Sequence, residues 1–297
     1  MVKLLIKRIY KYCVKHKWEI GFLENTVEDI LDGQKPKVWW VKHCYRDRWF
    51  ADPFILSEDQ ETITLLVEEY YDPIELGRIA KLVIDKKSHK IVLNSLVLQL
   101  DTHLSFPAIL RKNGKIYIYP ENFNSGKLLI YEYLLDSNTC QLVDVFCDAP
   151  LTDAIYRNIE GCDYIFSTDG KDPNGKMLGI YSKNENGQFM LTANVNFSEN
   201  IARMAGDFFT LESNLYRPAQ ESNTTYGHSI SIQKVSIDEG CFLMKEVVRI
   251  PSPHKIHKLG FHTFNKYGET VVVDVKGFRR PVLGNICYFL KHLVGLE

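Results

Sequence analysis

Trp49-Phe50-Ala51-Asp52-Pro53-Phe54-Ile55-Leu56, together with the apolar run at residues 62–69, is the stretch that decides the fold. The first segment is apolar and carries a carboxylate near its start. A polar turn follows, and the second segment ends on carboxylates. Two short apolar segments separated by turn residues predict a β-hairpin.

The same unit recurs four more times along the chain, at intervals of about 50 residues. The later copies open at residues 105–110, 152–156, 205–209 and 260–264, and they return at 115–121, 164–169, 215–220 and 270–274. A repeated unit of this size made of short strands is typical of a β-propeller. Chance similarity among the hairpins of a β-sandwich is the alternative. Five copies that share an opening motif and a return strand favour an all-β, five-bladed propeller.

The remaining segments predict how the ring closes and where it ends. Residues 37–43 predict a strand that supplies the outer strand of the last blade and so removes an exposed sheet edge. Residues 19–23 form a possible short strand within a link. We therefore divide the chain into an N-terminal helix and link (1–35), one propeller (36–278) and a C-terminal helix (279–297).

Both ends of the chain carry apolar residues at helical spacing among basic residues. This pattern predicts short basic amphipathic helices at residues 1–17 and after Pro281. Such helices either pack on the propeller with their basic groups in water or lie on an anionic membrane surface.

Composition narrows the class of protein. Hydrophobic residues make up 45% of the 297 residues and charged residues 25%, which is ordinary for a soluble globular protein. A net charge of −1 provides no overall field for nucleic acid, so we expect no nucleic-acid partner. Seven cysteines without metal-type spacing, and no secretory signal, predict reduced thiols and a cytoplasmic protein, either free or peripheral to the membrane. No apolar run reaches the roughly 18 residues of a membrane span.

Propeller geometry gathers the ends of the repeats at one mouth of the central channel, because the innermost strand starts there and the next strand returns there. The acidic side chains at these ends are Asp52, Glu69, Glu121, Asp153, Asp169 and Asp274. Carboxylates in a cleft suit glycosidic chemistry, in which one stays ionised and another holds a proton. The alternative for any one acid is a structural role, since Asp before Pro commonly accepts backbone N–H bonds.

We take Asp52, Asp153, Glu121 and Glu69 as candidate catalytic residues. The candidate substrate-binding residues are polar or aromatic groups near strand ends: Trp49, Arg78, His103, Arg157, Asp169, Arg217, Gln220, His228, His262 and Asp274. We expect no obligatory cofactor. A divalent cation is possible because several acids point to one channel, whereas the histidines at 254, 257 and 262 match no zinc spacing.

A set of short motifs in a fixed order carries a family resemblance. The motifs are Lys17-Trp18-Glu19-Ile20-Gly21, Phe50-Ala51-Asp52-Pro53-Phe54, Glu68-Glu69-Tyr70, Gly77-Arg78-Ile79-Ala80, Ser105-Phe106-Pro107, Pro120-Glu121, Thr152-Asp153-Ala154, Ser167-Thr168-Asp169 and Arg217-Pro218-Ala219-Gln220. The chain resembles a family of propeller domains named for the N-terminal domain of plant glucosamine inositolphosphorylceramide transferase. It is more distantly similar to the five-bladed glycoside hydrolases, the arabinanases, levansucrases and invertases.

The resemblance implies a carbohydrate-active protein of cell-surface glycan biosynthesis. In the hydrolase clan Asp52 would match the base or nucleophile and Asp153 the stabilising acid. The general-acid Glu has no match, so either Glu121 or Glu69 serves in its place or the protein does not hydrolyse by that scheme. Three functions stay open: glycosyl transfer, glycoside hydrolysis, and non-catalytic glycan binding that serves a partner glycosyltransferase. The expected ligand is a glycan or sugar donor.

Overall fold

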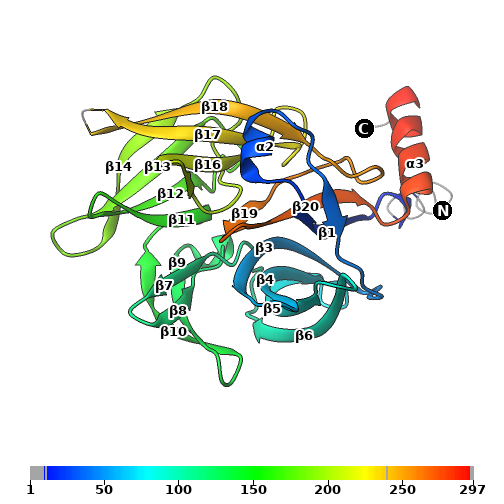
Figure 1. The fold of residues 1–297 in the computed structure, drawn as a ribbon, viewed down its shortest axis with the longest axis horizontal. Coiled ribbons are helices and arrows are strands. Elements are labelled where there is room, and N and C mark those ends of the chain that lie inside the picture. Colours follow the sequence, from blue (N-terminus) through cyan, green and yellow to red (C-terminus); the bar gives the residue numbers. More distant parts are fainter. Residues whose placement is uncertain (1–9, 11, 239, 295–297) are drawn as a thin grey trace.

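Five antiparallel sheets of four strands each surround a central axis (Figure 1), which confirms the predicted all-β, five-bladed propeller. The computed structural model describes residues 10, 12–238 and 240–294. The first blade contains β3 (Arg48–Glu58), β4 (Thr62–Tyr71), β5 (Leu76–Asp85) and β6 (Lys90–Leu98). The second contains β7 (Ile109–Lys112), β8 (Lys115–Ile118), β9 (Leu128–Leu134) and β10 (Thr139–Cys147), with a 3-10 turn at Phe123–Ser125.

The remaining blades follow in chain order. The third contains β11 (Leu151–Ile159), β12 (Cys162–Asp169), β13 (Met177–Lys183) and β14 (Phe189–Asn196). The fourth contains β15 (Phe209–Leu211), β16 (Asn214–Glu221), β17 (Ser229–Asp238) and β18 (Cys241–Pro251). The fifth starts with β19 (Phe264–Tyr267) and β20 (Thr270–Phe278) and is completed from the other end of the chain.

Ring closure uses two N-terminal strands. β1 (His16–Leu23) pairs with β20, and β2 (Val38–Trp40) pairs with β1 as the outer strand. The strand expected at residues 37–43 therefore does close the last blade. β1 lies in the region that we had assigned to a helix and link, because β20 would otherwise present an unpaired edge. Trp18, Ile20 and Phe22 alternate as buried residues along β1, which is the period of a strand.

The ends of the chain are partly outside this description. The N-terminal helix expected at residues 1–17 falls mostly on residues outside the described range, and β1 already begins at His16. A short helix, α2 (Val27–Leu31), links β1 to β2, and α3 (Pro281–Val294) follows β20 and stands at the edge of the ring (Figure 1). Within the described residues, no helix is both long and apolar enough to span a bilayer.

Apolar side chains fill the spaces between neighbouring blades. One cluster joins Phe106 of the second blade, Phe166 of the third and Phe208 of the fourth, all of them buried. Blade-to-blade packing fixes where each inner strand begins, and the polar ends of these strands are left around the channel mouth.

Candidate functional site at the channel mouth

The repeated opening motif has an unusual backbone conformation. Asp52, Phe106 and Asp153 occupy equivalent repeat positions and all have a positive φ, of 49°, 44° and 44°. In β3 and β11 the strand pairing shifts register at this point, as in a β-bulge. A bulge bends the strand and redirects a side chain. The N–H groups of these residues are therefore not paired within their own sheet, and they are free to bond to a neighbouring blade.

A carboxyl group from the preceding blade accepts each of these N–H bonds. The N–H of Asp52 donates to Asp274 Oδ2 at 2.9 Å, and that of Phe106 donates to Asp52 Oδ2 at 3.1 Å. The N–H of Asp153 donates to Glu121 Oε2 at 2.9 Å. These three acids therefore hold neighbouring blades together. This structural role is additional to any catalytic role.

Asp153 and Glu121 meet at Arg203. Arg203 Nε lies 2.5 Å from Asp153 Oδ2, and its Nη2 lies 3.3 Å from Glu121 Oε2. The amide nitrogen of Gln220 also donates to Asp153 Oδ2, at 2.6 Å. Gln220 Oε1 is buried and has no hydrogen-bond partner among the described residues. This amide oxygen is therefore available to a ligand hydroxyl or to water.

Asp52, His262 and Asp274 form the second half of the mouth. His262 Nδ1 lies 2.7 Å from Asp274 Oδ1, and its Nε2 lies 3.6 Å from Asp52 Oδ1. The Trp18 ring stacks on the imidazole with a centroid distance of 3.7 Å, and the Tyr226 ring meets its edge at 5.5 Å. A buried imidazole between two carboxylates is stabilised in its protonated form.

Burial sets the protonation of these groups. Burial raises the pKa of Glu121 to about 8, against the opposing effect of Arg203 and with further help from the charge of Asp153. Burial also raises the pKa of Asp52 well above its usual range, although His262 opposes this. Burial alone would lower the pKa of His262, but Asp274 and Asp52 outweigh it and the net pKa is raised. Glu121 therefore carries a proton at neutral pH beside an ion-paired Asp153.

A further polar pair links the third blade to the fourth. Asp207 Oδ1 has no hydrogen bond and faces Arg157 Nη1 at 3.9 Å. Burial raises the pKa of Asp207 to about 6, which Arg157 partly opposes. Arg157 thus lies near an acid of the fourth blade and not beside the Asp153–Glu121 pair.

Glu69 and Arg78 were expected at the mouth, but they pair with each other within the first blade. Glu69 is 1% exposed and is held by Arg48 at 2.9 Å and Arg78 at 2.6 Å, between strands of the first blade. Its neighbour Glu68 is the residue whose charge acts on Asp52. Successive side chains of a strand point to opposite faces, so only one of the two can face the channel.

Three other expected residues lie apart from the acids of the mouth. Arg217 is fully buried within the fourth blade, where it donates to Gln233 Oε1 at 2.7 Å and to the Ala202 carbonyl. Asp169 is exposed and accepts the N–H of Lys171 in a turn. His228 pairs with Glu221 at 3.0 Å.

The last two expected residues lie on the first blade and beside it. His103 Nε2 lies 3.0 Å from Glu68 Oε1, and Trp49 stacks on Tyr70 at 4.8 Å. The structure therefore brings together six of the expected residues, Asp52, Glu121, Asp153, Gln220, His262 and Asp274, and His103 reaches this group through Glu68.

Sequence reasoning missed Arg203, Glu68 and Lys276. Arg203 lies in the irregular segment before β15. This segment passes beside β16, and the Arg203 carbonyl accepts the N–H of Gln220. No motif marks such a position. Lys276 follows Asp274 by two residues on β20, and the period of a strand could have placed it on the same face.

Two clusters of three residues carry side-chain atoms that could coordinate a cation. Ligand atoms of Asp52, His262 and Asp274 lie within 4.8 Å of one another, as do those of Glu19, His254 and His257. In the second group His254 Nδ1 accepts two backbone N–H bonds, so the neutral ring carries its proton on Nε2 and cannot ligate with it. In the first group both carboxylates already accept backbone N–H bonds.

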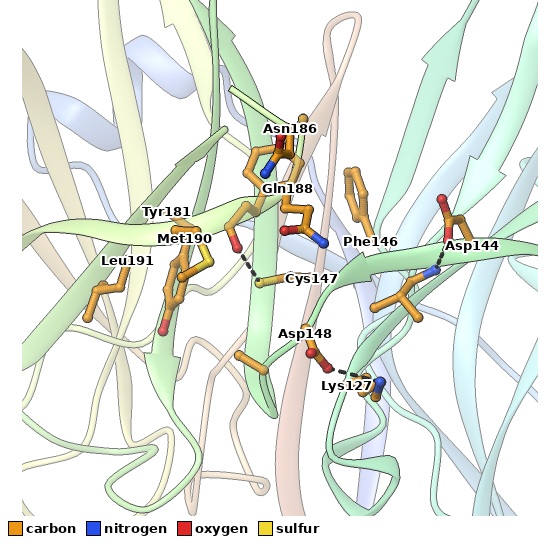
Figure 2. A pocket seen from close by; sticks show the side chains of 14 residues that line it. Lys127, Asp144, Phe146, Cys147, Asp148, Tyr181, Asn186, Gln188, Met190 and Leu191 are labelled. Carbon is orange, nitrogen blue, oxygen red and sulfur yellow. Dashed lines mark hydrogen bonds and ion pairs between the residues drawn. The ribbon is translucent and has the colours of Figure 1, made fainter. Parts of the chain in front are cut away.

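A separate groove lies away from the mouth, between the outer strands of the second and third blades. Figure 2 shows Phe146 and Cys147 from β10 facing Gln188 and Met190 at the start of β14. Its volume is about 590 Å³. None of the acids described above lines it.

The fold is a five-bladed propeller with a cluster of buried acids at the start of its inner strands. Residues 40–264 match the family described as Glucosamine inositolphosphorylceramide transferase 1, N-terminal. The chain belongs to this family, which confirms the resemblance seen in the sequence.

Curated relatives are plant proteins named Glucosamine inositolphosphorylceramide transferase 1. The one from Arabidopsis thaliana is 29% identical over 200 residues, which are 64% of this chain and 26% of that protein. The one from Oryza sativa subsp. japonica is 26% identical over 201 residues, which are 64% of this chain and 27% of that protein. The chain thus spans about a quarter of the length of these relatives.

Solved structures with a similar fold include glycoside hydrolases. A thermostable family-43 glycoside hydrolase superposes with a TM-score of 0.55 and 12% identity, over 82% of this chain and 90% of that one. A family-43 β-1,3-galactosidase with galactodeoxynojirimycin superposes with a TM-score of 0.52 and 11% identity, over 71% and 81%. At these identities the likeness shows the shared fold.

Proposed function

We propose that the protein binds a sugar at the channel mouth and transfers a glycosyl group there during synthesis of a cell-surface glycan. The observation that carries this proposal is Glu121, whose pKa is about 8, beside Asp153, which is ion-paired with Arg203. Acids with separated protonation states are what glycosidic chemistry requires. The name of the family, a glycosyltransferase, supports the same direction.

In the proposed reaction Glu121 gives its proton to the leaving oxygen while the bond from that oxygen to the anomeric carbon breaks. Asp153 stabilises the positive charge that develops on the sugar. The acceptor hydroxyl forms the new bond to the anomeric carbon, and its proton passes to Asp52, whose ionised form is favoured by the charge of His262 at 3.6 Å. Water in place of the acceptor would turn the same steps into hydrolysis.

The test is turnover of sugar nucleotides, lipid-linked sugars and simple glycosides, followed by mass spectrometry. Loss of a general acid costs about 10³-fold in rate, so we expect Glu121→Gln and Asp52→Asn each to lose activity on that scale. Asp136→Asn is the matched control because Asp136 is exposed in the turn between the outer strands β9 and β10. The products distinguish transfer from hydrolysis. Full activity in both site variants would refute the proposal.

Glycan recognition without turnover is the second candidate. It is favoured by the fourth blade, which offers the amide of Gln220 to Asp153 at 2.6 Å in place of a further acid. On this reading the propeller holds a glycan for a partner glycosyltransferase. Binding without turnover, with affinity kept in Glu121→Gln, would support recognition and exclude catalysis.

A peripheral position on a cytoplasmic, anionic membrane surface is a further part of the proposal. Side chains on α3 expose apolar surface, with Val282 73% exposed and Phe289 63% exposed. A cavity of about 610 Å³ at the base of α3 is lined by Lys15, Lys17, Lys42, Arg46, Arg48, Arg279 and Arg280, with Glu19 as its one acidic lining residue. Apolar surface beside basic groups suits anionic lipid.

Vesicle sedimentation tests this location. We expect binding to vesicles with phosphatidylserine and little binding to phosphatidylcholine alone. Phe289→Asp should reduce the bound fraction, whereas Tyr267→Asp, at an exposed position on β19, should leave it unchanged. Equal binding by both variants would place the contact elsewhere.

A further inference from the structure

Lys276 is a cation of the mouth that the proposed chemistry does not use. It lies on β20 two residues after Asp274, on the same face of the strand, and pairs with Trp18 of β1. Its Nζ lies 5.6 Å from the centre of the Trp18 ring and 5.5 Å from that of the Tyr226 ring. Two aromatic rings therefore flank the ammonium group.

No carboxylate balances this charge. Among the residues that the structure describes, Lys276 Nζ forms no ion pair and no hydrogen bond, whereas Lys17 pairs with Glu19 and Lys266 with Glu269. Burial lowers the pKa of Lys276, and no acidic group opposes this effect. A largely buried ammonium group needs a hydrogen-bonding anion to offset its lost hydration.

Tyr226 connects Lys276 with the acids of the mouth. Its ring lies 5.1 Å from the Arg203 guanidinium as well as 5.5 Å from Lys276 Nζ. Burial raises the pKa of the phenol well above its usual range, and Asp153 is among the acids that contribute. A group bound at Lys276 would therefore be linked to the Asp153–Glu121 pair through Tyr226 and Arg203.

We propose that Lys276 binds an acidic group, a carboxylate or a phosphate, that is carried by the sugar substrate. The inference rests on the proposed function only in taking the mouth as the sugar site. A neutral hydroxyl would leave the ammonium charge unbalanced, whereas an anion forms a charge-assisted hydrogen bond with it. The mouth is thus selective for acidic sugars or for glycosyl phosphates over neutral sugars.

The test is calorimetric binding of four probes to the 297-residue chain. Glucuronate and glucose 1-phosphate carry the two acidic groups, methyl glucoside is the neutral sugar, and inorganic phosphate is the anion without a sugar. The variants are Lys276→Met, which keeps the apolar stem between the rings, and Lys276→Arg, which keeps the charge. Lys234→Met, at an exposed position on β17, is the matched control.

We expect at least one acidic sugar to bind about tenfold more tightly than methyl glucoside and than inorganic phosphate. Lys276→Met should remove this preference, while Lys276→Arg and Lys234→Met should retain it. The preferred probe tells a carboxylate from a phosphate. Equal binding of acidic and neutral sugars, an unchanged preference in Lys276→Met, or no binding of either acidic sugar would overturn the inference.

A footprint of the unmutated protein provides a second readout if a variant fails to fold. Acetylation of Lys276 by acetic anhydride, followed by mass spectrometry, should slow in the presence of the acidic sugar and not with methyl glucoside. Absence of this protection would overturn the inference. Protection of Lys276 without any turnover would support the inference and refute only the transferase proposal. Turnover that is the same in the unmutated protein and in Lys276→Met would refute only the inference.

Discussion

Arg203 connects two acids that come from different blades, Glu121 after β8 and Asp153 in β11. Its guanidinium is almost fully buried, and its neighbour Ala202 is held through its carbonyl by the buried Arg217. The expected substrate-binding residue Arg217 is thus a positioning residue for Arg203. At the scale of single residues, the mouth is a network in which the charged groups share partners.

Removal of Arg203 tests this dependence. Arg203→Met leaves Asp153 buried without its cation, and we expect the free energy of unfolding to fall by about 3 kcal/mol. The control is Arg249→Met, which breaks an exposed pair with Glu246 and should cost less than about 1 kcal/mol. Urea denaturation measures both, and equal losses would contradict the assigned role.

Glu121 predicts a pH dependence of stability with a definite sign. Its pKa is about 8 in the folded protein against an ordinary value of 4.5, so the folded state binds more protons between these limits. Its contribution is complete below pH 4.5 and is lost as the pH rises through 8. Between pH 4.5 and 8 the unfolding free energy of the unmutated protein should therefore fall with the slope of about one bound proton, and this fall should be absent in Glu121→Gln. Parallel profiles for the two proteins between pH 4.5 and 8 would exclude the raised pKa.

At the scale of elements, bulges and turns position the side chains of the mouth. The loop between β16 and β17 carries Tyr226, and it turns at Gly227, which has a φ of 57°. A Cβ added at Gly227 would lie 2.6 Å from the Cβ of His262. This glycine therefore allows the loop to pass directly over the imidazole.

Gly227→Ala should be more harmful than an alanine at an equivalent turn. Gly268 has a φ of 56° and open space around it, so Gly268→Ala costs only the backbone term of about 1 kcal/mol. We expect Gly227→Ala to cost clearly more and to weaken sugar binding as well, because the added methyl group displaces Tyr226 from His262. Thermal melting and calorimetry measure the two effects; identical behaviour of both variants would show that the loop adapts.

At the scale of the whole molecule, the ring is closed by strands from opposite ends of the chain. Without β1, β20 would lose one of its two partner strands and the first and last blades would separate at the mouth, where Asp52 donates its N–H to Asp274. Closure and the site therefore depend on the same contacts.

Two deletions distinguish the closing strand from the terminal helix. A variant without residues 1–24 lacks β1, and we expect it to lose cooperative unfolding. A variant without residues 281–297 lacks α3, which contributes no strand, and it should keep a cooperative transition. Circular dichroism on heating reads both out, and a cooperative transition in the first variant would show that closure is dispensable.

The blades and their order follow from the sequence because strand periodicity and turn residues are local properties. The same repeats predicted that Asp52, Glu121, Asp153 and Asp274 would meet, since equivalent positions of a symmetric ring share one end of the channel. Asp52 and Asp153 even share their backbone conformation.

The tertiary structure alone decided which neighbours of these acids take part. Glu68 and Glu69 are adjacent and chemically alike, and the register of β4 determines which one faces Asp52. Arg203 lies in an irregular segment, where no periodicity marks a side chain's direction. Protonation also depends on burial, which arises only when the blades pack together, so the proton on Glu121 and the unbalanced charge of Lys276 are properties of the folded ring.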